Sequence, residues 1–188
     1  MQRQSQLWLI RHAPVDGPRG LIHDIDAPAD VSDQAALSRL RWLLPNPHVA
    51  VSSPARRARE TAAALGLVAR ADPAFSEQDF GSWTGRRHED IRRDSEAAYD
   101  AFWRAPASNR PPDGGSFIDQ IARVRDGIAA LPAGDVIVIA HAGTVRAALA
   151  VALDLPPENA LRFVIDPLSL TRLDRLDGGW RVVAVNRC

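Results

Sequence analysis

Lysine is absent from this chain, and cysteine occurs only once. All 23 basic residues are arginines, which excludes lysine Schiff-base chemistry and a phosphate-binding loop that depends on lysine. The single cysteine, Cys188, predicts no disulfide framework, no cysteine nucleophile and no thiolate zinc site. Catalytic chemistry in this chain must therefore come from histidine, arginine, aspartate or glutamate.

Long apolar runs and an excess of either charge are also missing. No stretch approaches the roughly 18 uncharged apolar residues of a membrane helix. The first apolar run, residues 7–10, is shorter than the roughly 7 to 15 apolar residues of a signal peptide. The 23 acidic and 23 basic residues cancel, without the basic stripe that attracts nucleic acids or membrane surfaces. We therefore expect a cytoplasmic protein with a small-molecule partner, and neither nucleic acid nor membrane as a partner.

The alternation of strand and helix patterns predicts the fold class. With 188 residues, the chain is long enough to bury one core, and we expect a single domain over residues 1–188; the oligomeric state stays open. The predicted strands cover residues 7–10, 48–53 and 136–140, with a closing hairpin at 168–186. The predicted helices cover residues 33–44, 54–66, 86–105 and 116–131, and a last one starts near 143. This order predicts an α/β fold, a three-layer α/β/α sandwich with a mostly parallel central sheet.

Two histidines directly follow two of the predicted strands. Arg11 and His12 end one strand, and His141 ends another. Ligands bind at the carboxyl edge of such a sheet, so the two imidazoles face the same crevice if their strands are neighbours. Ala142 and Gly143 then open a helix whose free N–H groups favour an anion.

Arginines and one acidic loop add what phosphate ester chemistry needs. The forked guanidinium groups of Arg11 and Arg57 suit phosphate. A neutral imidazole such as that of His12 can attack phosphorus and carry a phosphohistidine. Glu77, in a glycine-punctuated loop, is the candidate to protonate the leaving alcohol and then to activate water. These residues predict a phosphomonoesterase.

Four motifs resemble those of the histidine phosphatase superfamily, the phosphoglycerate mutase-like proteins. In chain order they are "RHA" at 11–13, "SSPARRARETA" at 52–62, "EQDFGSWTG" at 77–85 and "HAGTVR" at 141–146. The resemblance implies a phosphoglycerate mutase-like fold, a metal-independent reaction without cofactors, and a phosphohistidine intermediate. The implied site residues are the nucleophile His12, the proton donor Glu77, and the phosphate ligands Arg11, Arg57, His141 and Ala142.

Within that family, three stretches are most similar to the α-ribazole phosphatases of cobalamin biosynthesis. They are "FGSWTGRRHEDI", "YDAFWRAP" and "RPPDGGSF". The similarity implies α-ribazole 5′-phosphate as a substrate. Two other functions stay open, namely a phosphoglycerate mutase-type phosphotransfer and a catalytically silent phosphate-binding regulatory module.

This sequence also departs from the family pattern. Ala13 and Ala142 replace common glycines, and Pro14-Val15 replaces a frequent Glu-Thr. Gly115 stands where relatives often have a glutamate. These changes leave the five implied catalytic and phosphate-binding side chains in place, and Ala142 keeps its backbone N–H as a donor, so we expect the changes to affect the choice of substrate.

Several other residues have both a functional and a structural interpretation. His23, Trp83 and His88 are candidates for contact with the leaving alcohol, and Asp16 and Asp166 are open in the same way. The "HDID" stretch at 23–26 lacks a convincing set of metal ligands, and we predict no metal.

The aromatic and charged residues after the acidic loop favour structural roles. Phe102 and Trp103 are predicted to be core residues rather than a stacking platform. Acidic residues interrupt "RRHEDIRRD" at 86–94, so this stretch is predicted to be a solvated helix face rather than a nucleic-acid site. Two further acidic residues are interpreted as structural, namely Glu60, on the predicted helix that carries Arg57, and Asp79, two residues after Glu77.

Overall fold

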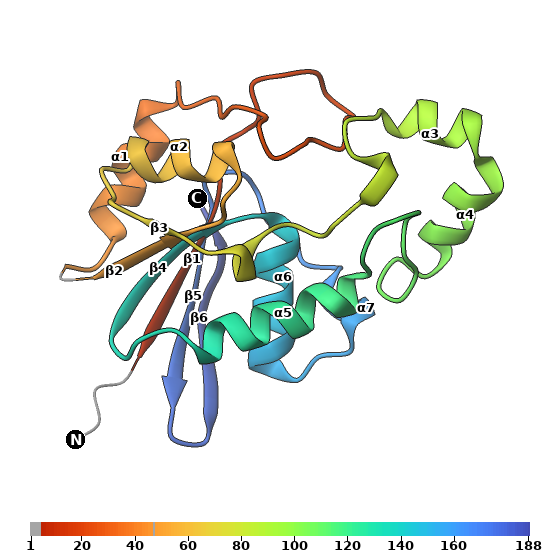
Figure 1. Ribbon diagram of the computed structural model, residues 1–188. Coiled ribbons are helices and arrows are strands. Elements are labelled where there is room, and N and C mark those ends of the chain that lie inside the picture. The colour runs from red at the N-terminus through yellow and green to blue at the C-terminus, as the bar shows by residue number, and fades with distance from the viewer. Residues whose placement is uncertain (1–4, 47) are drawn as a thin grey trace.

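The computed structural model describes residues 5–46 and 48–188, and its centre is a six-stranded sheet (Figure 1). The strands are β1 (Gln6–Arg11), β2 (Val49–Ser52), β3 (Arg70–Ala71), β4 (Asp135–Ala140), β5 (Leu170–Leu176) and β6 (Gly179–Arg187). Their spatial order is β3-β2-β4-β1-β5-β6. The first four in this order run parallel, and β5 is antiparallel to both β1 and β6.

Helices cover both faces of the sheet. They are α1 (Gln34–Leu43), α2 (Arg56–Ala64), α3 (His88–Asp94), α4 (Glu96–Arg104), α5 (Phe117–Ala129), α6 (Ala142–Leu153) and α7 (Pro157–Ala160). Two single 3₁₀ turns are η1 (Pro73–Phe75) and η2 (Gly81–Trp83). Helices α1 and α2 lie on one face and α5 and α6 on the other, while α3 and α4 extend beyond the sheet (Figure 1). The predicted three-layer α/β/α class is confirmed.

The central strand β1 shows why the buried strands appear in the sequence as continuous apolar runs. Leu7 and Leu9 point into the core beneath α5 and α6, whereas Trp8 and Ile10 point into the core beneath α1 and α2. Successive side chains of a strand face opposite sides, so a strand covered on both faces needs apolar residues at every position. Across the described ranges, no helix is long and apolar enough to span a bilayer.

One predicted helix is in fact two. The stretch predicted as a helix over 86–105 breaks at Ser95, whose φ of −151° and ψ of 56° are not helical. Phe102 is buried, but Trp103 is 45% exposed, so the prediction that Trp103 is a core residue was wrong. Neighbouring positions on a helix point about 100° apart, so a short helix that buries Phe102 leaves Trp103 at its edge.

Helix α5 begins with a capping box formed by Ser116 and Asp119. The Ser116 side chain accepts a hydrogen bond from the backbone N–H of Asp119, and the Asp119 carboxylate accepts one from the backbone N–H of Ser116. This reciprocal capping box fixes where the helix starts. It thereby sets which side chains α5 presents to the loop that contains Glu77.

A glycine lets α5 pack closely against the turn that precedes this loop. Gly127→Ala should lower the free energy of unfolding by about 1 kcal/mol, because the new Cβ would lie 2.6 Å from that of Ala74 in η1. The overlap outweighs the gain in helix propensity. Urea denaturation measures the change. The control Gly178→Ala lies in open space and should stay within about 0.5 kcal/mol of wild type; unchanged stability of Gly127→Ala would contradict the expectation.

Candidate active site

His12 and His141 meet at the carboxyl edge of the sheet. Strands β1 and β4 pair in parallel, with Arg11 opposite Ala140, and the backbone N–H of His12 donates to the Ala140 carbonyl at 2.9 Å. The two imidazole centroids are 5.0 Å apart. The strands are therefore neighbours, which was the condition for one shared crevice.

Arg57 connects the two imidazoles. Its Nε donates to Nε2 of His12 at 3.3 Å, and its Nη2 lies 3.3 Å from Nδ1 of His141. Its Nη1 donates to the Asp24 carbonyl at 2.6 Å. The neighbouring Arg56 instead bonds to Glu60 on the outside of α2. Of these two arginines, the structure therefore brings to the site Arg57, which is the one that the family motif implies.

The hydrogen bonds of the two imidazoles define opposite tautomers. Nδ1 of His12 lies 2.6 Å from the Ala13 carbonyl oxygen. A carbonyl only accepts, so Nδ1 carries the proton and Nε2 keeps a lone pair. In His141, Nδ1 accepts from Arg57, and Nε2 donates to Oγ of Ser53 at 2.8 Å. His12 thus holds an unprotonated Nε2 beside a guanidinium group.

Burial and positive charge keep both imidazoles neutral. The pKa of His12 lies well below its usual value because the ring is buried and faces His141, Arg57 and Arg11, which outweigh its bond to the Ala13 carbonyl. The pKa of His141 is lowered in the same direction, first by burial and then by Arg57, Arg11 and Arg123. An imidazolium ion here would lose hydration and meet like charges.

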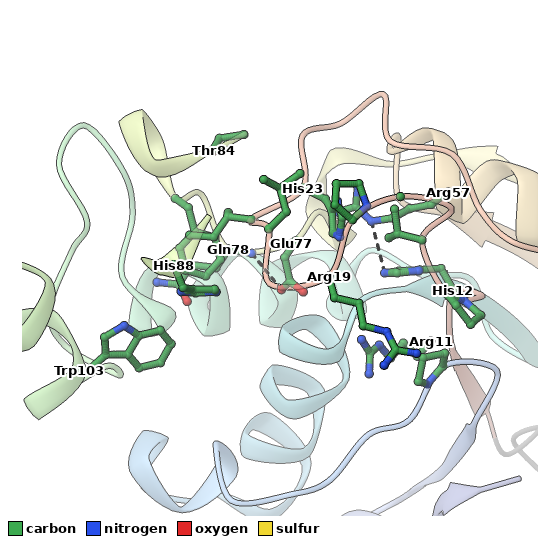
Figure 2. Close-up of a pocket in the computed structure, with 18 residues that line it drawn as sticks. Arg11, His12, Arg19, His23, Arg57, Glu77, Gln78, Thr84, His88 and Trp103 are labelled. Carbon is green, nitrogen blue, oxygen red and sulfur yellow. Dashed lines mark hydrogen bonds between the residues drawn. The ribbon is translucent and has the colours of Figure 1, made fainter. Parts of the chain in front are cut away.

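Two further arginines, Arg11 and Arg19, line the site from elements other than α2. Nη1 of Arg11 donates to the Ile165 carbonyl at 2.6 Å, while its buried Nε has no partner among the described residues. Burial lowers the pKa of this guanidinium. Arg19 lies in the long loop after β1, and Figure 2 shows it beside Arg11. Arg19 was not predicted as a site residue, since no spacing rule links a loop arginine to a strand end.

Glu77 lies at the start of α6. Its Oε1 accepts from the backbone N–H of Gln78 at 3.0 Å and from Nε2 of Gln120 at 3.1 Å. Its Oε2 accepts from the backbone N–H of Gly143 at 3.4 Å. A Cβ at position 143 would overlap Oε1, so the glycine gives the carboxylate room to approach the helix in this position.

Side chains of α5 and α6 hold the backbone that carries Glu77. Nη2 of Arg123 donates to the carbonyls of Ser76 at 2.7 Å and Glu77 at 3.0 Å. Oγ1 of Thr144 donates to the Phe75 carbonyl at 3.1 Å. Gln120 and Arg123 were not predicted as site residues. The signal present in the sequence was two polar residues on one face of a helix with an apolar stripe.

A cavity of about 460 Å³ extends outward from these groups (Figure 2). Its inner end is lined by Arg11, His12, Arg57 and Glu77, and His23 and His88 line it farther along. Ala142 is the first residue of α6, so its N–H belongs to the unpaired first turn of the helix.

Other predicted site residues lie outside this cavity. Trp83 is only 3% exposed and packs against Phe102, with the ring centroids 5.3 Å apart, so it supports the site from behind rather than facing it. Asp166 bonds to Asn186, and neither it nor Asp16 is among the lining residues. Over 5–46 and 48–188, no group of three or more His, Cys, Asp or Glu side chains could hold a metal ion.

The whole pattern of the chain matches a known family. The model of the histidine phosphatase superfamily (branch 1) matches residues 7–187. The chain belongs to this superfamily. The four sequence motifs of this histidine phosphatase therefore indicated the right family.

Two kinds of phosphatase are among the proteins similar to this chain. The glucosyl-3-phosphoglycerate phosphatase of Mycobacterium tuberculosis is 36% identical over 129 residues, which cover 60% of this chain and 57% of that relative's length. A solved structure of the mycobacterial enzyme has a TM-score of 0.84 at 29% identity and covers 99% of this chain and 100% of that one. The α-ribazole phosphatase of Shigella flexneri has a TM-score of 0.83 at 23% identity, with 96% of each chain covered, and this likeness shows the shared fold.

The lowered pKa values of the paired imidazoles predict how this histidine phosphatase responds to pH. His12 and His141 should stay neutral as the pH falls from about 7.5 to about 6, through the ordinary pKa of histidine. In this pH range the two histidines bind protons in the unfolded chain but not in the folded chain. They therefore make the free energy of unfolding decrease as the pH falls through 6.5. Imidazole ¹⁵N chemical shifts measure the protonation directly.

Inorganic phosphate provides the matched control for this titration. A bound dianion favours imidazolium, so saturating phosphate should raise the pKa of His141 and bring its titration into the measured range. The expectation is wrong if either ring titrates near pH 6.5 in phosphate-free solution.

Proposed function

We propose that this histidine phosphatase hydrolyses small-molecule phosphomonoesters without a metal, through a phosphohistidine on His12. One observation carries the proposal. The unprotonated Nε2 of His12 lies 3.3 Å from a nitrogen of Arg57, at the wall of a cavity that Glu77 also lines. A nucleophile, a cationic cradle and a carboxyl group therefore share one chamber.

The first step transfers the phosphoryl group to the enzyme. Arg11, Arg57 and His141 hold the phosphate oxygens while Nε2 of His12 forms a bond to phosphorus. The bond between phosphorus and the alcohol oxygen breaks at the same centre. Glu77, as a carboxylic acid, gives its proton to that oxygen, so the product leaves as a neutral alcohol.

The second step returns the enzyme to its starting state. Glu77, now a carboxylate, takes a proton from a water molecule as the water oxygen bonds to phosphorus. The bond from phosphorus to His12 breaks, and its electron pair returns to Nε2. Phosphate leaves, and Glu77 again carries the proton that the next cycle uses.

The intermediate can be trapped on its residue. Brief incubation with a ³²P-labelled ester and quenching in base should leave acid-labile phosphate on His12, because a phosphohistidine survives base and hydrolyses in acid. His12→Ala should lower turnover by about 10³-fold or more. His48→Ala, at an exposed histidine outside the cavity, should leave turnover unchanged. Undiminished turnover of His12→Ala would rule the proposal out.

The role of Glu77 is tested by the leaving group. Glu77→Gln should slow hydrolysis of an alkyl phosphate by about 10²-fold to 10⁴-fold, since an alkoxide needs the proton. Hydrolysis of p-nitrophenyl phosphate should fall much less, because nitrophenolate leaves without protonation. Asp79→Asn is the matched control, because Asp79 is exposed and its carboxylate bonds to the backbone N–H of Gly81. Equal losses on both esters would contradict the assignment.

Two rival functions give different results in the same assays. A phosphoglycerate mutase returns the phosphoryl group to its substrate, so it yields isomerised phosphoglycerate instead of free phosphate. The relatives named above are phosphatases, which favours hydrolysis. A silent phosphate-binding module turns over nothing on a broad panel of esters, and the presence of His12, His141 and Glu77 in one site argues against it.

Two specific substrates stand first in a panel assayed with chelator present. The motif resemblance described above supports α-ribazole 5′-phosphate and a place in cobalamin biosynthesis. The 36% identity to a glucosyl-3-phosphoglycerate phosphatase supports glucosyl-3-phosphoglycerate as the second substrate. The ratio of their kcat/KM values decides between them.

A further inference from the structure

The cavity is larger than a phosphate group needs. Its volume is about 460 Å³. Pockets of roughly 300 to 1,000 Å³ typically enclose ligands of drug-like size. The alcohol half of the ester therefore has a chamber of its own, and its walls carry information about that alcohol.

The outer end of this chamber is an aromatic wall made of Phe80, His88 and Trp103. Trp103 is 45% exposed, although its ring lies 5.9 Å from that of His88 and 5.0 Å from that of Phe102, measured between centroids. Figure 2 shows Trp103 and His88 across the cavity from Arg11. One part of the indole packs on neighbouring rings, and the rest remains available to a ligand.

Buried residues hold the aromatic wall in place. Phe102, Trp83 and Ile22 are each less than 10% exposed and form a small core behind it, which Phe80 and Tyr99 pack against. Edge-to-face contacts such as that between Trp83 and Phe102 fix ring orientation. The wall is thus held by packing from behind, and it leaves Trp103 partly exposed.

The aromatic wall carries no charge. The pKa of His88 is lowered by burial, so its ring is neutral, and its Nδ1 lies 3.3 Å from the Tyr99 hydroxyl. The cations Arg11, Arg19 and Arg57 lie toward His12, at the opposite end of the cavity from Trp103 (Figure 2). A charged group of the alcohol would lose hydration at the wall without gaining a partner of opposite charge.

We infer that the alcohol half of the substrate carries an uncharged ring that lies on Trp103. This inference rests on the proposed function and names the class of ester that the site takes. An indole face binds flat apolar surfaces, and both a heteroaromatic ring and the C–H face of a sugar offer one. Nε2 of His88 forms no hydrogen bond within the described part of the chain, and His88 lines the same end of the cavity, so this nitrogen is a partner for a polar substituent of the ring.

Three primary alkyl phosphates with similar leaving oxygens separate ring recognition from chemistry. Uridine 5′-monophosphate carries a heteroaromatic ring, glucose 6-phosphate carries a sugar ring, and glycerol 3-phosphate carries neither. The enzymes compared are wild type, Trp103→Ala, Trp103→Phe and the control Trp42→Ala, whose side chain is 85% exposed on α1 outside the cavity. Thermal unfolding of each variant verifies that it is folded.

Trp103→Ala should lower kcat/KM about 10-fold for at least one ring-bearing ester, a typical effect of losing a stacking residue. Glycerol 3-phosphate should change by less than about 2-fold, Trp103→Phe should lie in between, and Trp42→Ala should match wild type. A loss confined to the nucleotide identifies a heteroaromatic ring, and a loss confined to the sugar phosphate identifies a sugar.

Equal effects on all three esters, or no effect on any, overturn the inference. Phosphohistidine formation and turnover then persist, so the proposed function survives that result. If wild-type enzyme neither hydrolyses an ester nor forms a phosphohistidine, the proposed function fails and this inference fails with it.

Discussion

Parallel pairing of β1 with β4 places His12 and His141 side by side, and the rest of the site is arranged around these two rings. The register sets Arg11 opposite Ala140, so the two strands end at the same level of the sheet. A slip of one residue would turn each side chain to the other face of the sheet. The hydrogen bond from His12 N–H to the Ala140 carbonyl extends this register one residue beyond the strand.

The site concentrates positive charge in a chain whose formal charge is zero. Outside it, many arginines are paired on the surface, such as Arg56 with Glu60 and Arg86 with Asp94. Arg11 and Arg57 instead bond to carbonyl oxygens and imidazole nitrogens, and neither forms an ion pair among the described residues. Their charge is left for a ligand. Burial first, and this positive charge after it, lowers the pKa of both imidazoles, so the two rings are neutral.

Much of the arrangement followed from short-range pattern. Apolar runs located β1, β2 and β4, and the histidines after two strands indicated the sheet edge that carries the site. The same approach failed at residues 86–105, where a helical pattern continues through Ser95 although the backbone breaks there. It also failed for Trp103, because hydrophobicity predicts burial without indicating which apolar side chain a ligand cavity leaves open.

The sequence by itself determined the chemistry of this protein: the fold class, the family, and histidine with arginine and glutamate in place of lysine or cysteine. Only the tertiary structure decided how those groups are used. It set the tautomer of His12, the contact of Gln120 with Glu77 across 43 residues of chain, and the exposure of Trp103 in the cavity. Strands and caps depend on neighbours a few residues away, whereas these features depend on packing between distant segments, which local patterns do not encode.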